Sequence, residues 1–167
     1  MMPTFYTVTD TPIGKLLLVS RDGKLKRIEF HGGEESLAAA RDWRPAQEPF
    51  AEAIRQLELY FAGKLRAFKL PLAPEGTPFQ RATWDALLTI PYGETCSYAH
   101  IARALGRPSA VRAVGAANGR NPLPVVIPCH RVIGSNGHLT GFGGGLDIKR
   151  QLLELEGSLT QGLGLRG

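Results

Sequence analysis

The first thirty residues contain short hydrophobic runs separated by polar and glycine positions, a pattern typical of β-strands. Asp22-Gly23 lies between two of these runs and is a strong signal for a two-residue hairpin turn. We therefore expect the chain to begin with three strands, the last two forming a hairpin. Their predicted ranges are Phe5 to Val8, Lys15 to Arg21 and Lys24 to Phe30.

Helical spacing follows. Glu34 to Asp42 is a short alanine-rich helix candidate, and Glu48 to Ala62 has hydrophobic residues three and four positions apart before Gly63 ends it. The expected buried stripe of the longer helix is Phe50, Ile54, Leu57 and Phe61.

A segment rich in proline and glycine, Leu70 to Gly76, predicts a linker. We place the domain boundary there. Residues 1–75 are expected to form an N-terminal α/β domain with its linker, residues 76–157 a second domain, and residues 158–167 a frayed tail.

The second domain has three helical patterns. Thr77-Pro78 is typical of an N-cap followed by the first helical residue, and it predicts a helix that runs to Ile90. Ser97 can cap a helix from Tyr98 to Leu105, and a third pattern runs from Ser109 to Asn118. The last two, joined by a turn that contains glycine, resemble a helix-turn-helix unit.

The third of these helices consists mainly of small residues, and Arg112 is its only charged side chain. Small side chains allow a backbone to approach a partner closely. That partner can be DNA or a tightly packed neighbouring helix, and the spacing leaves both interpretations open.

Three prolines between residues 121 and 128 disfavour helix at the preceding positions, so this segment is expected to be extended and to place Cys129 at the end of a buried strand. A turn at Ser135-Asn136-Gly137 and a glycine-rich loop at 141–145 follow. Asp147 is then expected to cap a last helix that Gly157 ends.

The chain has 167 residues and a net charge of +5. No Asp or Glu lies between Glu94 and Asp147. The cations in that interval are all arginines, which favours bidentate or stacked contacts with phosphate over a purely solubilising surface. They are Arg103, Arg107, Arg112, Arg120 and Arg131.

No run approaches the roughly 20 apolar residues that a membrane helix needs, and residues 1–10 lack a secretory signal pattern. Two cysteines do not make a disulfide framework in a chain of this length. We therefore expect free thiols in a cytoplasmic protein, or a nuclear one if the source is eukaryotic.

Cys129 and His130 place a thiol beside a base. A lone buried cysteine is more often a small hydrophobic residue than a nucleophile, and neighbouring side chains on a strand point to opposite faces. A direct Cys129–His130 bond is therefore excluded on a straight strand, and a relay through water is expected. Glu156 is a candidate carboxylate to orient the base, although sequence alone favours a solvated charge at a helix end.

A metal site made of Cys96, His100, Cys129 and His130 is disfavoured, because adjacent residues chelate poorly and no C-x-x-C pair is present. The loop at 141–145 lacks the spacing of a nucleotide-binding fingerprint, so it is expected to shape a pocket. We expect no metal and no cofactor.

The second domain resembles the O6-alkylguanine-DNA alkyltransferases, also called methylated-DNA–protein-cysteine methyltransferases. The resemblance runs from about Thr77 to Gly157, and the first domain matches only in outline. The residues that carry it are Pro91-Tyr92-Gly93-Glu94, Ser97-Tyr98, Arg112-Ala113-Val114-Gly115, Asn121-Pro122, Ile127-Pro128-Cys129-His130-Arg131-Val132, Gly144-Gly145-Leu146, Leu153 and Glu156-Gly157.

This resemblance implies an α+β protein with a ribonuclease H-like N-terminal domain and a mainly helical, winged-helix-like C-terminal domain. It implies irreversible, single-turnover repair of O6-alkylguanine in double-stranded DNA, with O4-alkylthymine as a second substrate, by a protein that is monomeric in solution. Clustering along DNA stays open.

The resemblance also implies residue roles. Cys129 accepts the alkyl group, His130 is its base through a bridging water, and Glu156 orients His130. Asn121 orders the turn beside the cysteine, and Tyr98 lies near the phosphate 3′ to the lesion and donates a proton to the leaving base. In binding DNA, Arg112 fills the gap left by a flipped nucleotide, with Ala113 beside it on the helix that lies in the minor groove. Val132, Phe142 and Gly143 line the guanine pocket.

Phe142 stands where many relatives carry tyrosine, and Gly143 stands where some carry a hydroxyl side chain, so the choice between methyl and bulkier adducts is left open. Two other interpretations are kept. One is a protein that binds alkylated bases without repairing them, which the presence of Cys129 argues against. The other is a helix-turn-helix regulator, which would prefer one DNA sequence over damage. A cysteine hydrolase is disfavoured, because that function gives no role to the arginines between Glu94 and Asp147.

Overall fold

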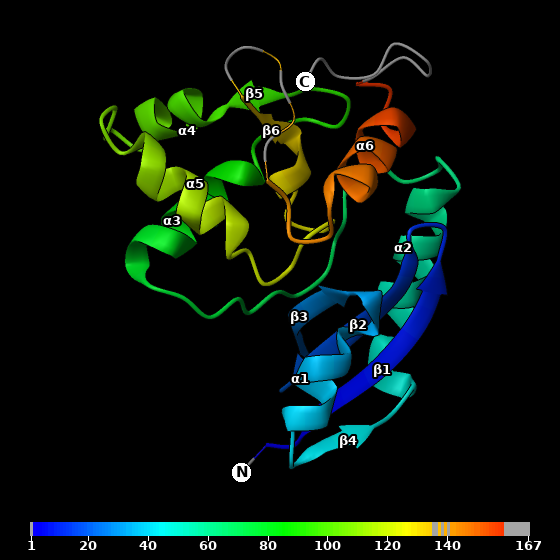
Figure 1. Ribbon diagram of the computed structural model, residues 1–167. Coiled ribbons are helices and arrows are strands. Elements are labelled where there is room, and N and C mark those ends of the chain that lie inside the picture. Colours follow the sequence, from blue (N-terminus) through cyan, green and yellow to red (C-terminus); the bar gives the residue numbers. More distant parts are fainter. Residues whose placement is uncertain (1, 135–136, 138, 140, 159–167) are drawn as a thin grey trace. The chain divides into compact units, whose positions relative to one another are not determined.

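The computed structural model describes residues 2–134, 137, 139 and 141–158 (Figure 1). The chain divides into two compact units, Met1–Glu75 and Gly76–Gly167. Among the described residues, no helix is both long and apolar enough to cross a membrane. Apart from Ser158, the predicted tail lies outside the described residues. Of the turn predicted at 135–137, only Gly137 is described, and its N–H donates to Gly134 O at 2.9 Å.

The N-terminal unit contains a four-stranded sheet in the order β3-β2-β1-β4 (Figure 1). The predicted hairpin is confirmed: Arg21 pairs with Lys24, and Asp22 and Gly23 have φ values of 53° and 72°, as a tight primed turn requires. The short parallel edge strand β4 was not predicted. The strand bounds are β1 Thr4–Thr11, β2 Gly14–Arg21, β3 Lys24–Phe30 and β4 Trp43–Pro45.

The two helices of this unit are shorter than predicted. α1 spans Glu34–Ala39 after the 3₁₀ turn η1 (His31–Gly33), and α2 spans Ala51–Phe61 after η2 (Glu48–Phe50).

The predicted stripe on α2 is only partly right, because Ile54 and Phe61 are half-buried while Gln56 and Tyr60 are buried. Gln56 can occupy the buried face because the backbone of Lys69 satisfies its amide, with bonds of 2.9 and 3.0 Å.

The predicted linker is not free. Its first residues lie alongside β3, where Leu25 N–H donates to Pro71 O at 2.8 Å and Ala73 N–H donates to Leu25 O at 2.9 Å. The unpaired edge of β3 offers backbone donors and acceptors, and the proline-rich segment satisfies two of them. Lys26 also pairs with Glu75, so this segment belongs to the N-terminal unit as far as Glu75.

In the C-terminal unit the helix caps predicted at Thr77 and Ser97 are confirmed. Thr77 forms a capping box with Gln80 at the start of α3 (Pro78–Leu87), and Ser97 accepts from His100 N–H at the start of α4 (Tyr98–Ala104). α5 (Val111–Gly119) packs against both helices, and the buried indole of Trp84 donates to Ala117 O at 2.9 Å. α4 and α5 together form the expected helix-turn-helix.

A two-stranded parallel sheet and a last helix complete this unit. β5 (Cys96–Ser97) pairs with β6 (Val132–Ile133). α6 spans Leu146–Leu155, and its N-cap is Gly145. The predicted cap at Asp147 is wrong, because this residue lies inside the first turn, where its charge complements the helix dipole.

Candidate active site

Cys129 begins a 3₁₀ turn, η3 (Cys129–Arg131), that leads directly into β6. The predicted position at the end of a strand is therefore wrong. The thiol is 4% exposed, and its burial raises the pKa of Cys129 to about 11, although the Asn121 amide and the Lys149 charge oppose this shift. At neutral pH the resting side chain is thus a thiol, and it needs a base to react.

The segment before Cys129 turns instead of extending. Its own backbone closes the turn, with Ile127 N–H donating to Leu123 O at 2.8 Å, and the side chain of Asn121 adds two further hydrogen bonds. The Asn121 Nδ2 group donates to Ile127 O at 2.8 Å, and its Oδ1 atom accepts from Leu123 N–H at 2.9 Å. Buried Val125 adopts a φ of 75°, a strained value for a β-branched residue. The prolines exclude a regular helix, and hydrogen bonds within the segment and to the Asn121 side chain, not to a neighbouring strand, satisfy its backbone.

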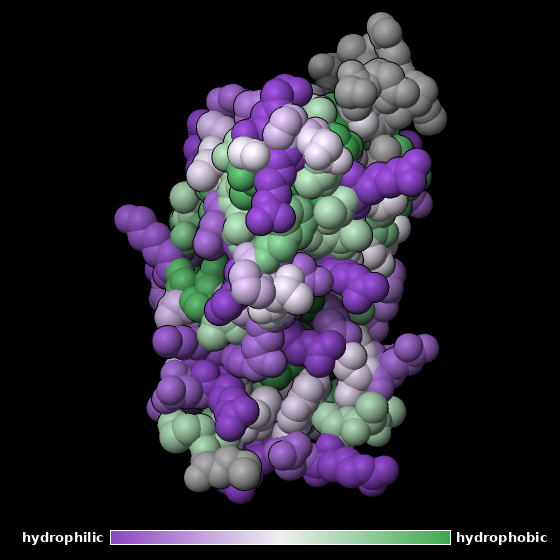
Figure 2. Space-filling view, turned by 90° about the vertical axis from the view of Figure 1, so that its left-hand side faces the viewer, coloured by the Kyte–Doolittle hydropathy of each residue, from purple (hydrophilic) through white to green (hydrophobic). Residues whose placement is uncertain are grey.

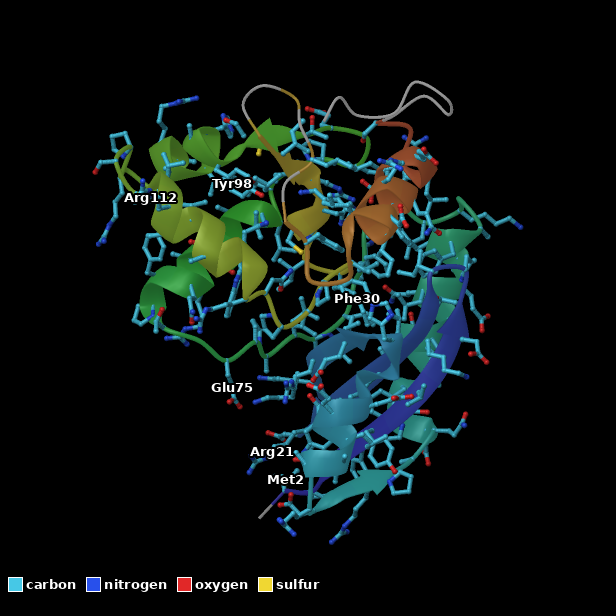
Figure 3. All side chains as sticks on the ribbon, in the orientation of Figure 1. Met2, Arg21, Phe30, Glu75, Tyr98 and Arg112 are labelled. Atoms are coloured by element: carbon cyan, nitrogen blue, oxygen red, sulfur yellow. The ribbon has the colours of Figure 1, made fainter. Side chains whose placement is uncertain are left out.

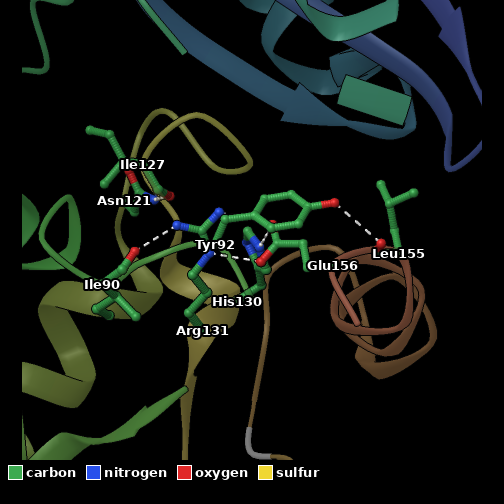
Figure 4. Close-up of polar contacts among 8 residues, drawn as sticks. All are labelled: Ile90, Tyr92, Asn121, Ile127, His130, Arg131, Leu155 and Glu156. Carbon is green, nitrogen blue, oxygen red and sulfur yellow. Dashed lines mark hydrogen bonds and ion pairs between the residues drawn. The ribbon is translucent and has the colours of Figure 1, made fainter. Parts of the chain in front are cut away.

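His130 and Glu156 form a buried pair (Figure 4). The Nε2 atom of His130 lies 2.8 Å from Oε2 of Glu156, and both side chains are fully buried. Burial lowers the pKa of His130, the Glu156 carboxylate raises it, and Arg131 and Lys149 lower it further, with a net shift downward. Glu156 is therefore not the solvated helix-end charge that its sequence position favoured.

The other ring nitrogen of His130, Nδ1, is buried and has no hydrogen-bond partner among the described residues. Because Nε2 donates to a carboxylate, Nδ1 is the nitrogen left to accept a proton. Cys129 and His130 are adjacent in η3 but form no direct hydrogen bond. The geometry of a straight strand does not apply to this 3₁₀ turn, so the relay through water stays a prediction.

Arg131 was predicted to belong to a phosphate-binding set, and this is wrong, because its side chain is 9% exposed and turned inward. Its guanidinium donates to both oxygens of Glu156, at 2.7 and 3.0 Å, and to Ile90 O at 2.7 Å (Figure 4). The ring of Tyr92 lies 5.8 Å from the guanidinium carbon. The inward turn leaves Arg103, Arg107, Arg112 and Arg120 as the arginines of the acid-free interval available to a phosphate.

Lys149 on α6 is a buried cation that sequence reasoning missed. Its Nζ atom donates to Val132 O at 2.7 Å, and burial lowers the pKa of this amine to about 8. Its spacing is the signal that could have found it. Lys149 lies three and four positions before Leu152 and Leu153, on the same buried stripe.

The predicted DNA-contacting residues lie on the helix-turn-helix. Tyr98 is half-buried at the start of α4, and a side chain at Gly115 of α5 would begin 3.9 Å from its ring. Arg112 and Ala113 are exposed on α5, and Figure 3 shows Arg112 projecting outward from the C-terminal unit. Figure 2 views this side, where hydrophilic residues, in purple, lie among white and pale green ones.

The predicted pocket residues differ in exposure. Val132 is buried, and Phe142 is half-buried with its ring centre 6.0 Å from Lys149 Nζ. Gly143 is exposed, and no described atom lies within 4 Å of the point that a β-carbon would occupy there. In the part of the chain that the structure describes, no three His, Cys, Asp or Glu side chains come together as metal ligands would.

Comparison with known proteins places this site in a family. A model described as the 6-O-methylguanine DNA methyltransferase DNA-binding domain matches residues 78–158, and one described as the ribonuclease-like domain of the same protein matches residues 4–74. The chain belongs to the 6-O-methylguanine DNA methyltransferase family. The resemblance drawn from the motifs around Cys129 and the predicted two-domain α+β fold are both confirmed.

Individual members of this methyltransferase family match over nearly the whole chain. A methylated-DNA–protein-cysteine methyltransferase from Methanosarcina acetivorans is 52% identical over 154 residues, which is 92% of this chain and 99% of the relative. The solved structure of a Mycobacterium tuberculosis O6-methylguanine methyltransferase superposes with a TM-score of 0.85 at 47% identity, covering 95% of this chain and 96% of that one. M. tuberculosis OGT in complex with DNA has the same TM-score at 48% identity, covering 92% and 93%.

Proposed function

We propose that this chain repairs alkylated DNA by direct reversal, moving the alkyl group from O6 of guanine to Sγ of Cys129. DNA is the partner named for the family domain that residues 78–158 match, and one similar solved structure is a complex with DNA. The observation that supports Cys129 as acceptor is its burial beside the His130–Glu156 pair, whose closest atoms are 2.8 Å apart. O4-alkylthymine presents the same alkyl–oxygen bond and is a second substrate.

The reaction is one displacement. The Sγ atom of Cys129 forms a bond to the alkyl carbon as the bond from that carbon to O6 breaks, and guanine leaves with the electron pair. The thiol proton passes through a water molecule to Nδ1 of His130, and the leaving guanine takes one proton from the Tyr98 hydroxyl. The product is a thioether, which ordinary thiol exchange does not reverse, so each molecule acts once.

Base catalysis is needed because the resting thiol, with a pKa of about 11, yields little thiolate at neutral pH. A base that takes the proton as the sulfur attacks overcomes this. The Glu156 carboxylate holds Nε2 of His130, which fixes the tautomer and aims Nδ1 as the proton acceptor. Asn121 holds the turn that positions Cys129.

An alkyl carbon on a stacked base cannot be reached, so the nucleotide must leave the duplex at a cost of a few kcal/mol. Arg112 on exposed α5 fills the gap, and the neighbouring Ala113 allows the helix backbone to approach the minor groove closely. Val132, Phe142 and Gly143 then line the pocket for the flipped base.

Intact-mass measurement tests the proposal directly. After incubation with a duplex that carries one O6-methylguanine, the protein gains the mass of one methyl group on Cys129 and the DNA loses its methyl group. Cys129→Ala stays at its original mass and still binds the damaged duplex. A wild-type protein that binds this duplex but leaves both masses unchanged is a damage-binding protein, and the proposal is then wrong.

A further inference from the structure

The guanidinium of Arg131 is held by three hydrogen bonds beside the His130–Glu156 pair. It lies on the same turn as Cys129 and His130, yet its partners are Glu156, the C-cap of α6, and Ile90, which lies three residues after α3. Two of its nitrogens hold the two oxygens of Glu156, at 2.7 and 3.0 Å, in the bidentate geometry in which arginine binds carboxylates most strongly.

One oxygen of Glu156 is shared. Oε2 receives the N–H of His130 at 2.8 Å and the Nη2 group of Arg131 at 3.0 Å. The carboxylate can therefore turn away from the imidazole only by breaking its bonds to Arg131. The third bond of the guanidinium, to Ile90 O at 2.7 Å, and the ring of Tyr92 fix the guanidinium in turn.

We infer that Arg131 is a positioning residue of the transfer reaction: it fixes Glu156 on Nε2 of His130 and opposes protonation of the imidazole, which keeps Nδ1 open to the thiol proton. This inference rests on the proposed function and deepens it. Arg131 does not touch the substrate.

The charges around His130 support this role. Lys149 of α6 and Glu156 at its C-cap face it, and Arg131 and Cys129 lie beside it on η3. The ring centre of Tyr92 lies 5.8 Å from the guanidinium carbon. Burial lowers the pKa of His130, Glu156 raises it, and the positive charge of Arg131 lowers it. Without Arg131, the Glu156 carboxylate loses its bonded cation, and the pKa of His130 rises because the positive charge that lowers it is gone.

The pH dependence of transfer distinguishes this role from a merely structural one. In Arg131→Met, the acid limb of the single-turnover rate moves to higher pH by about one unit, so that at a pH on that limb transfer is about tenfold slower than in the wild type. Binding of the O6-methylguanine duplex, measured by anisotropy in a Cys129→Ala background, is unchanged. Lys64→Met, which removes an exposed cation from the N-terminal unit, leaves rate and pH profile unchanged.

Arg131→Lys separates charge from geometry. It keeps the positive charge but loses the bidentate contact, so the acid limb stays at its wild-type position while the plateau rate falls several-fold. An Arg131→Met limb at the wild-type pH, or an Arg131→Lys plateau equal to that of the wild type, overturns the inference. Weaker DNA binding with an unmoved limb means that Arg131 contacts phosphate after all.

A measurement on the wild-type protein covers the case in which these variants do not fold. Nitrogen NMR of the imidazole is expected to show a proton on Nε2 and none on Nδ1 of His130 at neutral pH. A proton on Nδ1 overturns the inference. A wild-type protein that gains no methyl group refutes the proposed function itself, whereas normal transfer with an unmoved Arg131→Met profile refutes only the role of Arg131.

Discussion

Around Cys129, single side chains satisfy backbone groups and also act on the pKa of the thiol, which both Asn121 and Lys149 lower. Asn121 bonds to the backbone on both sides of the turn before the thiol, and Lys149 bonds to Val132 O just after η3. Unpaired buried polar groups cost about 1–3 kcal/mol each, so these contacts stabilise the turn as well as position it. The residues that shape the chemistry also hold the turn in place.

Replacing His130 with Gln is expected to slow methyl transfer by about two to four orders of magnitude, the usual contribution of a general base. Binding of the damaged duplex should hardly change, because His130 is fully buried. Single-turnover rates by intact mass and binding by anisotropy measure the two effects separately. Equal losses in both would contradict the relay, and thermal unfolding shows whether the variant is folded.

At this scale the residue types were predictable, and their contacts were not. The sequence predicted a nucleophile, a base and a carboxylate at Cys129, His130 and Glu156, with the roles taken from family resemblance. The sequence wrongly placed Arg131 among the phosphate-binding arginines, because the positions of charges along the chain do not show which side chains point inward. It also favoured a solvated Glu156, since the buried partners come from 25 and 26 residues away.

At the level of elements, α5 connects the exposed Arg112 to the interior of the C-terminal unit. Trp84 of α3 holds the carbonyl of Ala117, and Asn118 donates to Cys129 O at 3.4 Å. α5 thus carries the exposed Arg112 near its start and is hydrogen-bonded, near its end, to the turn that holds Cys129. The two interpretations of its small residues are compatible, because one side packs on α3 and α4 while the other is exposed.

Arg112→Ala should therefore separate duplex repair from chemistry. Transfer from O6-methylguanine in duplex DNA is expected to slow about tenfold or more, because the flipped nucleotide loses the side chain that replaces it in the stack. Transfer from the free O6-methylguanine base should keep its wild-type rate, since no base has to be extruded. Both rates are read by intact mass, with Lys64→Ala as a control for charge loss. A similar loss on both substrates would place Arg112 in the chemistry.

For the whole molecule, the buried charges of the C-terminal unit link its stability to pH. The pKa of His130 is lowered by burial from its ordinary value of 6.5, so the unfolded chain takes up this proton at a higher pH than the folded one. Protons then favour the unfolded state. The stabilisation is present above about pH 6.5 and is lost as the pH falls towards the lower pKa of the folded state.

The free energy of unfolding of the C-terminal unit should therefore fall by up to about 1.4 kcal/mol per pH unit below pH 6.5 from this proton alone. Urea unfolding followed by Trp84 fluorescence in a Trp43→Phe background reports on this unit, because the chain has two tryptophans and Trp84 is 1% exposed. In His130→Gln, the free energy of unfolding should fall less steeply with decreasing pH, because the variant lacks this titrating proton. An identical slope in both proteins would show that His130 is not the group responsible.

By itself the sequence determined the local features of this protein: the Asp22-Gly23 hairpin, the caps at Thr77 and Ser97, the two-domain α+β class and, through its motifs, the methyltransferase family. Each depends on residues close together in the chain. Only the tertiary structure decided that Cys129 lies on a 3₁₀ turn, that Arg131 faces inward and that Glu156 and Lys149 are buried. These features depend on partners distant in sequence, because burial removes water and leaves each polar group to the partners that folding brings to it.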